Sequence, residues 1–238
     1  MCAYVKDNNI WIRKFDYDTE VQITKDGKQN AILNGITDWV YEEEFSVTNL
    51  MAWSPDSKVL AFVRSDESEV PEYSMQVYGD GLYPGYYNFK YPKAGEKNST
   101  VSVMAYNVES KDTKKLDIPM DADGYIPRIT FTTKPEQLAV MTLNRQQNRF
   151  NMFYTNPKSG VSKLILKEEN KCYVDSEWLT SIHFMESGFT YVSEQDGYSH
   201  IYLYSPTGVM QRQITKGNWD VTAVSYTHLR AHETGAYL

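Results

Sequence analysis

Apolar and polar residues alternate with a period of two along much of the chain. The alternation is clearest at residues 9–15, 101–106 and 200–204, where β-branched and aromatic side chains recur at every second position. This period places successive side chains on opposite faces of an extended strand. Short turn signals separate these segments, and no capped helical pattern longer than about ten residues appears. The pattern therefore predicts an all-β chain.

Internal similarity narrows the fold class. Three segments share one layout of strand, polar turn, aromatic strand, turn and strand: residues 3–24, 138–165 and 189–215. A fourth copy begins at residues 53–62, is interrupted by an insert from Asp66 to Thr100, and resumes at Val101. Without the insert, each copy has the roughly 40 to 50 residues of one propeller blade. We therefore expect a partial β-propeller of about four blades, entered partway through the first, over residues 1–224.

Composition excludes several functional classes. The 238 residues include 31 acidic and 24 basic side chains, for a net charge of −7. Nucleic-acid binding needs a clustered excess of Lys and Arg, so no nucleic-acid partner is expected. Cys2 and Cys172 lack the spacing of a zinc site or a disulfide framework, and no cofactor or metal site is predicted. No run approaches the ~18 to 20 apolar residues of a membrane helix.

The most unusual local feature is a triplet of carboxylates, Glu42 to Glu44, bracketed by the aromatic residues Trp39, Tyr41 and Phe45. One interpretation is a solvated acidic turn. The other is a fixed cation site, because aromatic side chains anchored against a sheet would hold carboxylates that a free loop lets swing apart. A positively charged group of a ligand fits such a site best.

The segment that contains this triplet resembles the double-glutamate segment of the dipeptidyl peptidase IV family. The resemblance rests on residues 34–45 and the Trp-Ser-Pro-Asp run at 53–56, and is supported by residues 70–73, 91–95, 196–201 and 214–221. It extends from residue 1 to about residue 224. One local departure is that Phe45 follows Glu44 directly, whereas better-known animal members carry a valine between them. The contacts immediately after the triplet are therefore open.

The resemblance implies a propeller that gates a serine exopeptidase, which releases X-Pro or X-Ala dipeptides from peptide N-termini. Glu43 and Glu44 would bind the α-ammonium of the substrate, while Glu42 would be structural or face solvent. Two carboxylates form charge-assisted hydrogen bonds with an ammonium, and an internal peptide segment has no such cation. The alternative is a non-catalytic β-propeller that binds protein partners.

Catalytic residues are not predicted within this chain. It contains no Gly-x-Ser-x-Gly nucleophile elbow, and His200 lies in a strand pattern that favours a structural role. The chain is therefore interpreted as an internal fragment that lacks its partner, the C-terminal α/β-hydrolase domain, and that is inactive alone. The resemblance also allows a homodimer of the whole protein, in the periplasm, at the cell surface or secreted. Residues 225–238 depart from the blade pattern and are interpreted as a non-native tail.

Overall fold

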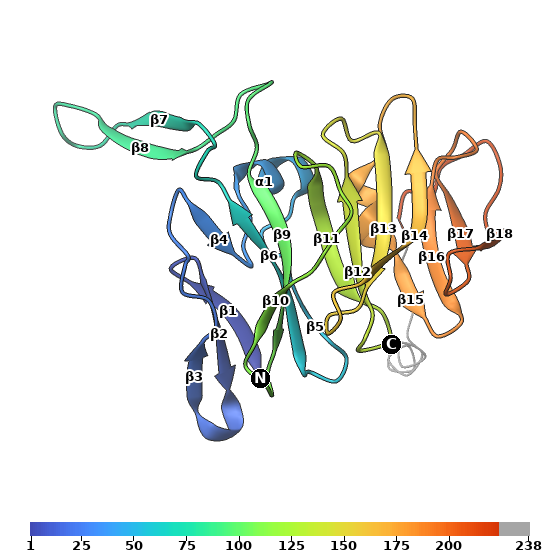
Figure 1. Ribbon diagram of the computed structural model, residues 1–238. Coiled ribbons are helices and arrows are strands. Elements are labelled where there is room, and N and C mark those ends of the chain that lie inside the picture. Colours follow the sequence, from blue (N-terminus) through green and yellow to red (C-terminus); the bar gives the residue numbers. More distant parts are fainter. Residues whose placement is uncertain (224–238) are drawn as a thin grey trace, which may run out of the picture. The chain divides into compact units, whose positions relative to one another are not determined.

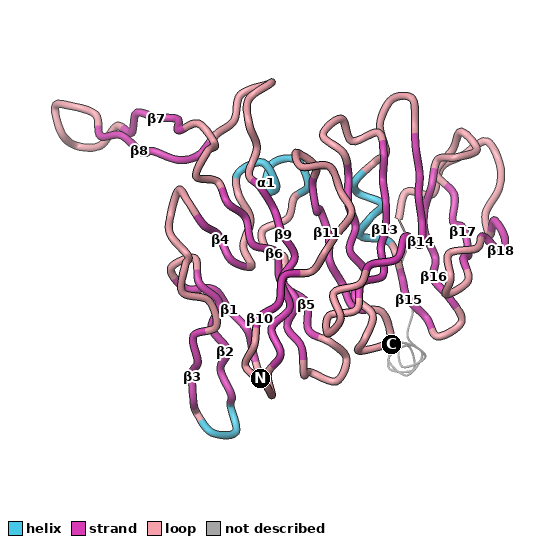
Figure 2. The backbone as a smooth tube through the Cα atoms, in the orientation of Figure 1, coloured by secondary structure: helices cyan, strands magenta, loops and turns pink. Residues whose placement is uncertain are grey.

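The computed structural model describes residues 1–223 as short strands joined by turns, with helical structure confined to three brief segments (Figure 1, Figure 2). The chain divides into two compact units, Met1–Glu177 and Trp178–Leu238. The all-β expectation is confirmed, because antiparallel sheets make up both units. None of the helices in the described part of the chain is long and apolar enough to cross a membrane.

The first unit contains three antiparallel sheets and a separate hairpin. The first sheet has the order β1-β2-β3, the second β10-β9-β6-β4 with β5 also paired to β6, and the third β11-β12-β13-β14, while β7 and β8 form the hairpin. The strands are β1 (Cys2–Lys6), β2 (Asn9–Lys14), β3 (Thr19–Gln22), β4 (Ile32–Asn34), β5 (Met51–Trp53), β6 (Val59–Asp66), β7 (Glu72–Val77), β8 (Gly85–Lys90), β9 (Thr100–Asn107), β10 (Thr113–Lys115), β11 (Tyr125–Phe131), β12 (Leu138–Leu143), β13 (Arg149–Thr155) and β14 (Ser162–Glu169). The helical segments are η1 (Phe15–Tyr17) and α1 (Trp39–Phe45).

The second unit is built on one sheet with the order β15-β16-β17-β18. Its strands are β15 (His183–Met185), β16 (Gly188–Ser193), β17 (His200–Tyr204) and β18 (Met210–Gln213), and the 3₁₀ helix η2 (Ser176–Ser181) precedes them. The four sheets match the expected number of blades. The repeats seen in the sequence, however, cover only three strands each. The structure adds a further strand in three sheets, where β5, β11 and β15 pair with β6, β12 and β16.

The cores explain why the alternation is imperfect in the central strands. Every residue of β12 is buried, and so are the first five residues of β6. A strand covered on both faces needs apolar side chains on both, which replaces alternation with a continuous apolar run. Between the first two sheets, Ile10 and Ile12 pack against Leu60, Phe62 and Tyr106. Both faces of β12 are therefore covered, and so are both faces of the first part of β6.

A loop that carries α1 leaves the second sheet and returns to it. Both β4 and β5 pair with β6, so residues 35–50 start and finish at the same strand. At the neck of this loop, Gly35 N donates to Val63 O, Leu50 N donates to Gly35 O and Val63 N donates to Leu50 O, at 2.9, 2.9 and 3.0 Å. Gly35 has a φ of +75°, and a Cβ there would lie 2.8 Å from the Met51 side chain. Glycine at this position therefore lets the loop close against the sheet.

Candidate functional site

The helix α1 is seven residues long and is fixed at both ends. The Asp38 Oδ1 atom accepts a hydrogen bond of 3.1 Å from Tyr41 N, which is the usual N-cap arrangement. The other Asp38 oxygen accepts from the hydroxyl of Ser99, at the end of the insert. After Phe45 the chain turns through Ser46, which has a left-handed φ of 53°. Isolated helices of this length are unstable in water, so these caps and the packing below hold α1 in place.

Aromatic packing attaches α1 to the third sheet. Tyr41 is 3% exposed, and its hydroxyl accepts a hydrogen bond of 2.8 Å from Ile126 N. Burial raises the pKa of Tyr41, so its hydroxyl stays protonated. The ring of Phe45 lies 5.3 Å from that of Tyr41 and 5.2 Å from that of Tyr125. The expected anchoring against the sheet is confirmed for Tyr41 and Phe45.

Trp39, the third anchor expected from the sequence, packs elsewhere. Its ring meets that of Tyr91 edge to face, with centroids 4.4 Å apart. Tyr91 follows the hairpin β7–β8 within the insert and also contacts Tyr73 of β7, at 5.6 Å between ring centroids. Trp39 therefore ties α1 to the insert, while the two other aromatic residues tie it to the third sheet.

The predicted site residues Glu43 and Glu44 both lie exposed on α1, as does Glu42. Successive helical residues are separated by about 100° around the axis, so the three carboxylates point in different directions. The last turn contains no basic residue, and carboxylates near a helix C-terminus face its negative dipole end. The negative charge of this end of α1 is therefore not neutralised from within the helix.

Glu44 has a side-chain partner that the sequence did not reveal. Its Oε1 atom accepts a hydrogen bond of 2.6 Å from Nε2 of Gln147, which lies 103 residues further along the chain in the turn between β12 and β13. In the described range 1–223, no side-chain hydrogen bond or ion pair engages Glu43. No local pattern could have indicated Gln147, because the contact depends on how the third sheet meets α1.

A buried carboxylic acid lies close to the N-cap of α1. Glu67, just after β6, is 5% exposed. Burial, together with the negative charge of Asp38, raises the pKa of Glu67 to about 7, against the opposing effect of Lys90. The base of the insert therefore contains a group that changes charge near neutral pH.

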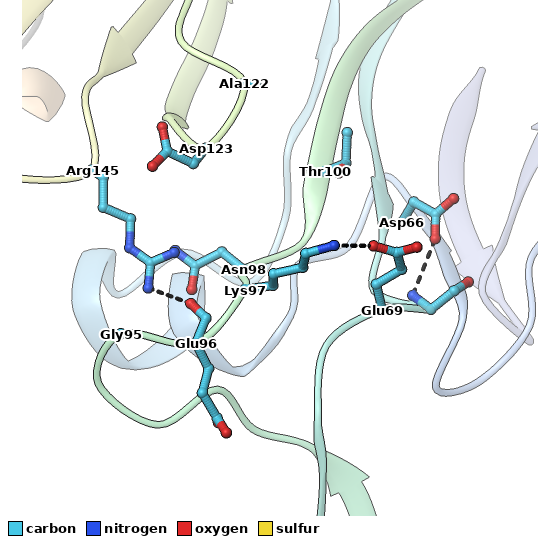
Figure 3. Close-up of a pocket in the computed structure, with 11 residues that line it drawn as sticks. Asp66, Glu69, Gly95, Glu96, Lys97, Asn98, Thr100, Ala122, Asp123 and Arg145 are labelled. Atoms are coloured by element: carbon cyan, nitrogen blue, oxygen red, sulfur yellow. Dashed lines mark hydrogen bonds and ion pairs between the residues drawn. The ribbon is translucent and has the colours of Figure 1, made fainter.

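A cavity of about 680 Å³ adjoins the aromatic cluster (Figure 3). Its lining is Asp66, Ser68, Glu69, Gly95, Glu96, Lys97, Asn98, Thr100, Ala122, Asp123 and Arg145. The cavity touches the cluster through Asn98, whose Nδ2 donates to the Tyr125 hydroxyl at 2.8 Å. Burial raises the pKa of Tyr125, the hydrogen bond from Asn98 and the charge of Arg145 oppose this rise, and the negative charge of Glu44 adds to it. Glu43 and Glu44 themselves do not line the cavity.

Two other candidates from the sequence have structural explanations or lie outside the described residues. In the second unit, His200 is fully buried, and its ring nitrogens contact Thr215 Oγ1 and the Gly217 carbonyl, each at 3.0 Å. The structural role expected for His200 is thereby confirmed. Within residues 1–223 no group of three or more His, Cys, Asp or Glu side chains is placed to hold a metal ion. The segment interpreted as a non-native tail lies outside the described residues.

Comparison with known proteins places the chain in a family. The family model described as the dipeptidyl peptidase IV (DPP IV) N-terminal region matches residues 1–233. The chain belongs to this family. A solved structure, the Porphyromonas gingivalis dipeptidyl peptidase 4, is 65% identical with a TM-score of 0.90, over 92% of this chain and 31% of that one. The expectation of a partial β-propeller of the dipeptidyl peptidase IV type is confirmed by this likeness.

More distant relatives show the same relation. The dipeptidyl-aminopeptidase B of Aspergillus niger is 32% identical over 249 residues, covering 93% of this chain and 27% of the relative. The prolyl endopeptidase FAP of Mus musculus is 32% identical over 235 residues, covering 92% of this chain and 31% of the relative. The chain thus spans between about a quarter and a third of the length of these relatives.

Proposed function

We propose that this chain is the substrate-recognising propeller region of a serine dipeptidyl aminopeptidase that releases X-Pro or X-Ala dipeptides from peptide N-termini. Glu43 and Glu44 bind the α-ammonium of the peptide substrate. The nucleophile and its triad belong to an α/β-hydrolase domain elsewhere in the whole protein. Support comes from the family match and from the names of the relatives, which are dipeptidyl peptidases and a prolyl endopeptidase.

The observation that carries this proposal is the anchored acidic end of α1. Capping by Asp38 and burial of Tyr41 and Phe45 fix the backbone beneath Glu43 and Glu44. Neither carboxylate forms an ion pair within residues 1–223. An ammonium therefore finds unpaired negative charge on a rigid support, where charge-assisted hydrogen bonds are stronger than neutral ones.

Such an arrangement limits cleavage to a fixed distance from the start of a peptide. A peptide with a free N-terminus has one α-ammonium, and the residues within its chain have none, so binding at the carboxylates sets the register of the substrate. The bond presented to a nucleophile at a fixed position is then always the same number of residues from the N-terminus. Peptides with an acylated N-terminus lack the cation and are rejected.

The test uses the full-length peptidase that contains this region, with Glu43→Gln and Glu44→Gln as isosteric, uncharged variants. Hydrogen bonds to charged groups contribute about 1.5–3 kcal/mol, so each variant should lower kcat/KM for an X-Pro chromogenic substrate by about 10- to 150-fold. Glu42→Gln is the matched control on the same helix and should change kcat/KM less than about threefold. Unchanged kinetics in both glutamate variants, or an equal loss in the control, would contradict the proposal.

A second candidate function is a non-catalytic module that binds protein partners. The observation in its favour is the hairpin β7–β8, whose residues are almost all exposed and include several aromatic side chains. One measurement distinguishes the two functions. A non-catalytic full-length protein releases no dipeptide from an X-Pro substrate, whichever residues occupy positions 43 and 44.

A further inference from the structure

The side chain of Gln147 forms a hydrogen bond with Glu44, although the turn that contains Gln147 does not require a side chain at this position. The turn connects β12 to β13, and Gln147 occupies it with a left-handed φ of 55°. A residue with a Cβ in this conformation costs about 1–2 kcal/mol, whereas glycine adopts it freely. Glycine would therefore serve the turn better. What the glutamine adds is a side chain, and the amide of that side chain reaches Glu44 at 2.6 Å.

The backbone of this turn is held from both sides. Gln147 N donates to Asn144 O at 2.8 Å, and Asn144 Oδ1 accepts from the amides of Asn148 and Arg149 at 3.0 and 2.9 Å. On its other side, Val174 N donates to Gln147 O at 2.7 Å. The backbone that carries the Gln147 side chain is therefore fixed, as is the backbone of α1 that carries Glu44. A hydrogen bond between two fixed supports restricts the carboxylate to fewer orientations.

The chemistry of the pair suits a carboxylate that must bind a cation. A carboxylate only accepts hydrogen bonds, so Gln147 offers it the NH₂ group and occupies one of about four lone-pair positions. The amide is neutral, so it adds no positive charge beside Glu44. A lysine or arginine at this position would also form a hydrogen bond with the carboxylate. Its positive charge, however, would neutralise Glu44 and would compete with the substrate ammonium for the carboxylate.

We propose that Gln147 is a positioning residue for substrate recognition. It orients the Glu44 carboxylate from the third sheet so that the free oxygen positions face the substrate's α-ammonium. This inference rests on the proposed function of Glu44. It adds that the specificity for a free N-terminus is shared between α1 and a turn 103 residues away.

The experiment compares Gln147→Met, Gln147→Lys and the control Gln146→Met in the full-length peptidase. Methionine has nearly the length of glutamine but no donor, and Gln146 is the exposed neighbour in the same turn. Since the ammonium is bound in both the ground state and the transition state, Gln147→Met should raise KM by about 5- to 20-fold with kcat within about twofold. Gln147→Lys should raise KM further, because its ammonium pairs with Glu44. Gln146→Met should leave both constants unchanged.

A double-mutant cycle distinguishes positioning from a general structural role. In the Glu44→Gln background, Gln147→Met should add less than about a twofold change, because the partner it orients has lost its charge. An undiminished effect in that background, or an unchanged KM in both Gln147 variants, would overturn the inference while leaving the role of Glu44 intact. If Glu44→Gln alone has no effect on KM, Glu44 does not bind the ammonium, and the positioning role of Gln147 fails with it.

Discussion

The helix α1 and the hairpin β7–β8 both interrupt the sheets of the first unit, and both are rich in aromatic residues. In α1, Tyr41 and Phe45 point inward and are buried against the third sheet. In the hairpin, Leu82 and Tyr83 at the tip are 98% and 88% exposed. A two-stranded hairpin has no second layer to cover its side chains, whereas α1 lies over a sheet. Aromatic residues therefore hold a segment in place only where a neighbouring surface covers them.

The largest effect should come from removing the aromatic anchor of α1. Tyr41→Ala deletes a buried ring and leaves Ile126 N without its acceptor, so we expect the free energy of unfolding to fall by about 3–5 kcal/mol. Tyr41→Phe keeps the ring and should cost about 1–3 kcal/mol, because the buried amide loses its hydrogen bond. Urea denaturation of the chain measures both. A loss below about 1 kcal/mol for Tyr41→Ala would show that α1 does not depend on this packing.

The next effect concerns Glu67, at the junction between α1 and the insert. Its pKa is raised from an ordinary 4.5 to about 7, so the folded chain retains a proton that the unfolded chain releases. The free energy of unfolding should therefore fall as pH rises through this window, with the full cost present above pH 7. Glu67→Gln should remove this dependence and stabilise the chain by about 3 kcal/mol at pH 8, with little effect at pH 4.

Urea denaturation at pH values from 4 to 8 measures the dependence on Glu67. Glu69→Gln is the matched control, because Glu69 is exposed in the same segment and forms an ion pair of 2.5 Å with Lys97. Exposed pairs contribute about 0–1 kcal/mol, so this variant should change stability little. A pH dependence that persists in Glu67→Gln would place the titrating group elsewhere.

The smallest effect should come from the hairpin tip. Leu82→Ser and Tyr83→Ser remove large side chains that are almost fully exposed, so each should change the free energy of unfolding by less than about 0.5 kcal/mol. The same denaturation experiment compares them with Tyr41→Ala. A loss above about 1 kcal/mol would show that the tip packs against the molecule, and the contrast with α1 would disappear.

Much of the fold follows from local pattern. The alternation in β2, β9 and β17 could be recognised in the sequence, because successive side chains of a strand point to opposite faces of its sheet. Of the three added strands, β5 and β15 were missed because three residues are too few to show a period. The start of β12 belonged to one of the repeats seen in the sequence, whereas the covering of both its faces is shown only by the structure.

The candidate site divides in the same way. The aromatic residues around Glu43 and Glu44 indicated an anchored segment, although a helix of seven residues was not expected there. The hydrogen bonds that fix the site join residues far apart in sequence: Asp38 to Ser99, Tyr41 to Ile126 and Glu44 to Gln147. The ring contact between Trp39 and Tyr91 was likewise not visible in the sequence.

The sequence by itself determined the all-β class, the repeat and the acidic, aromatic segment, because each of these features depends on the order of residues that are close together along the chain. Only the tertiary structure decided that the third sheet covers α1, that Glu44 accepts a hydrogen bond from Gln147, and that the buried Glu67 lies near the helix cap Asp38. These depend on how strands from different sheets pack, and packing joins residues whose separation in sequence carries no periodic signal.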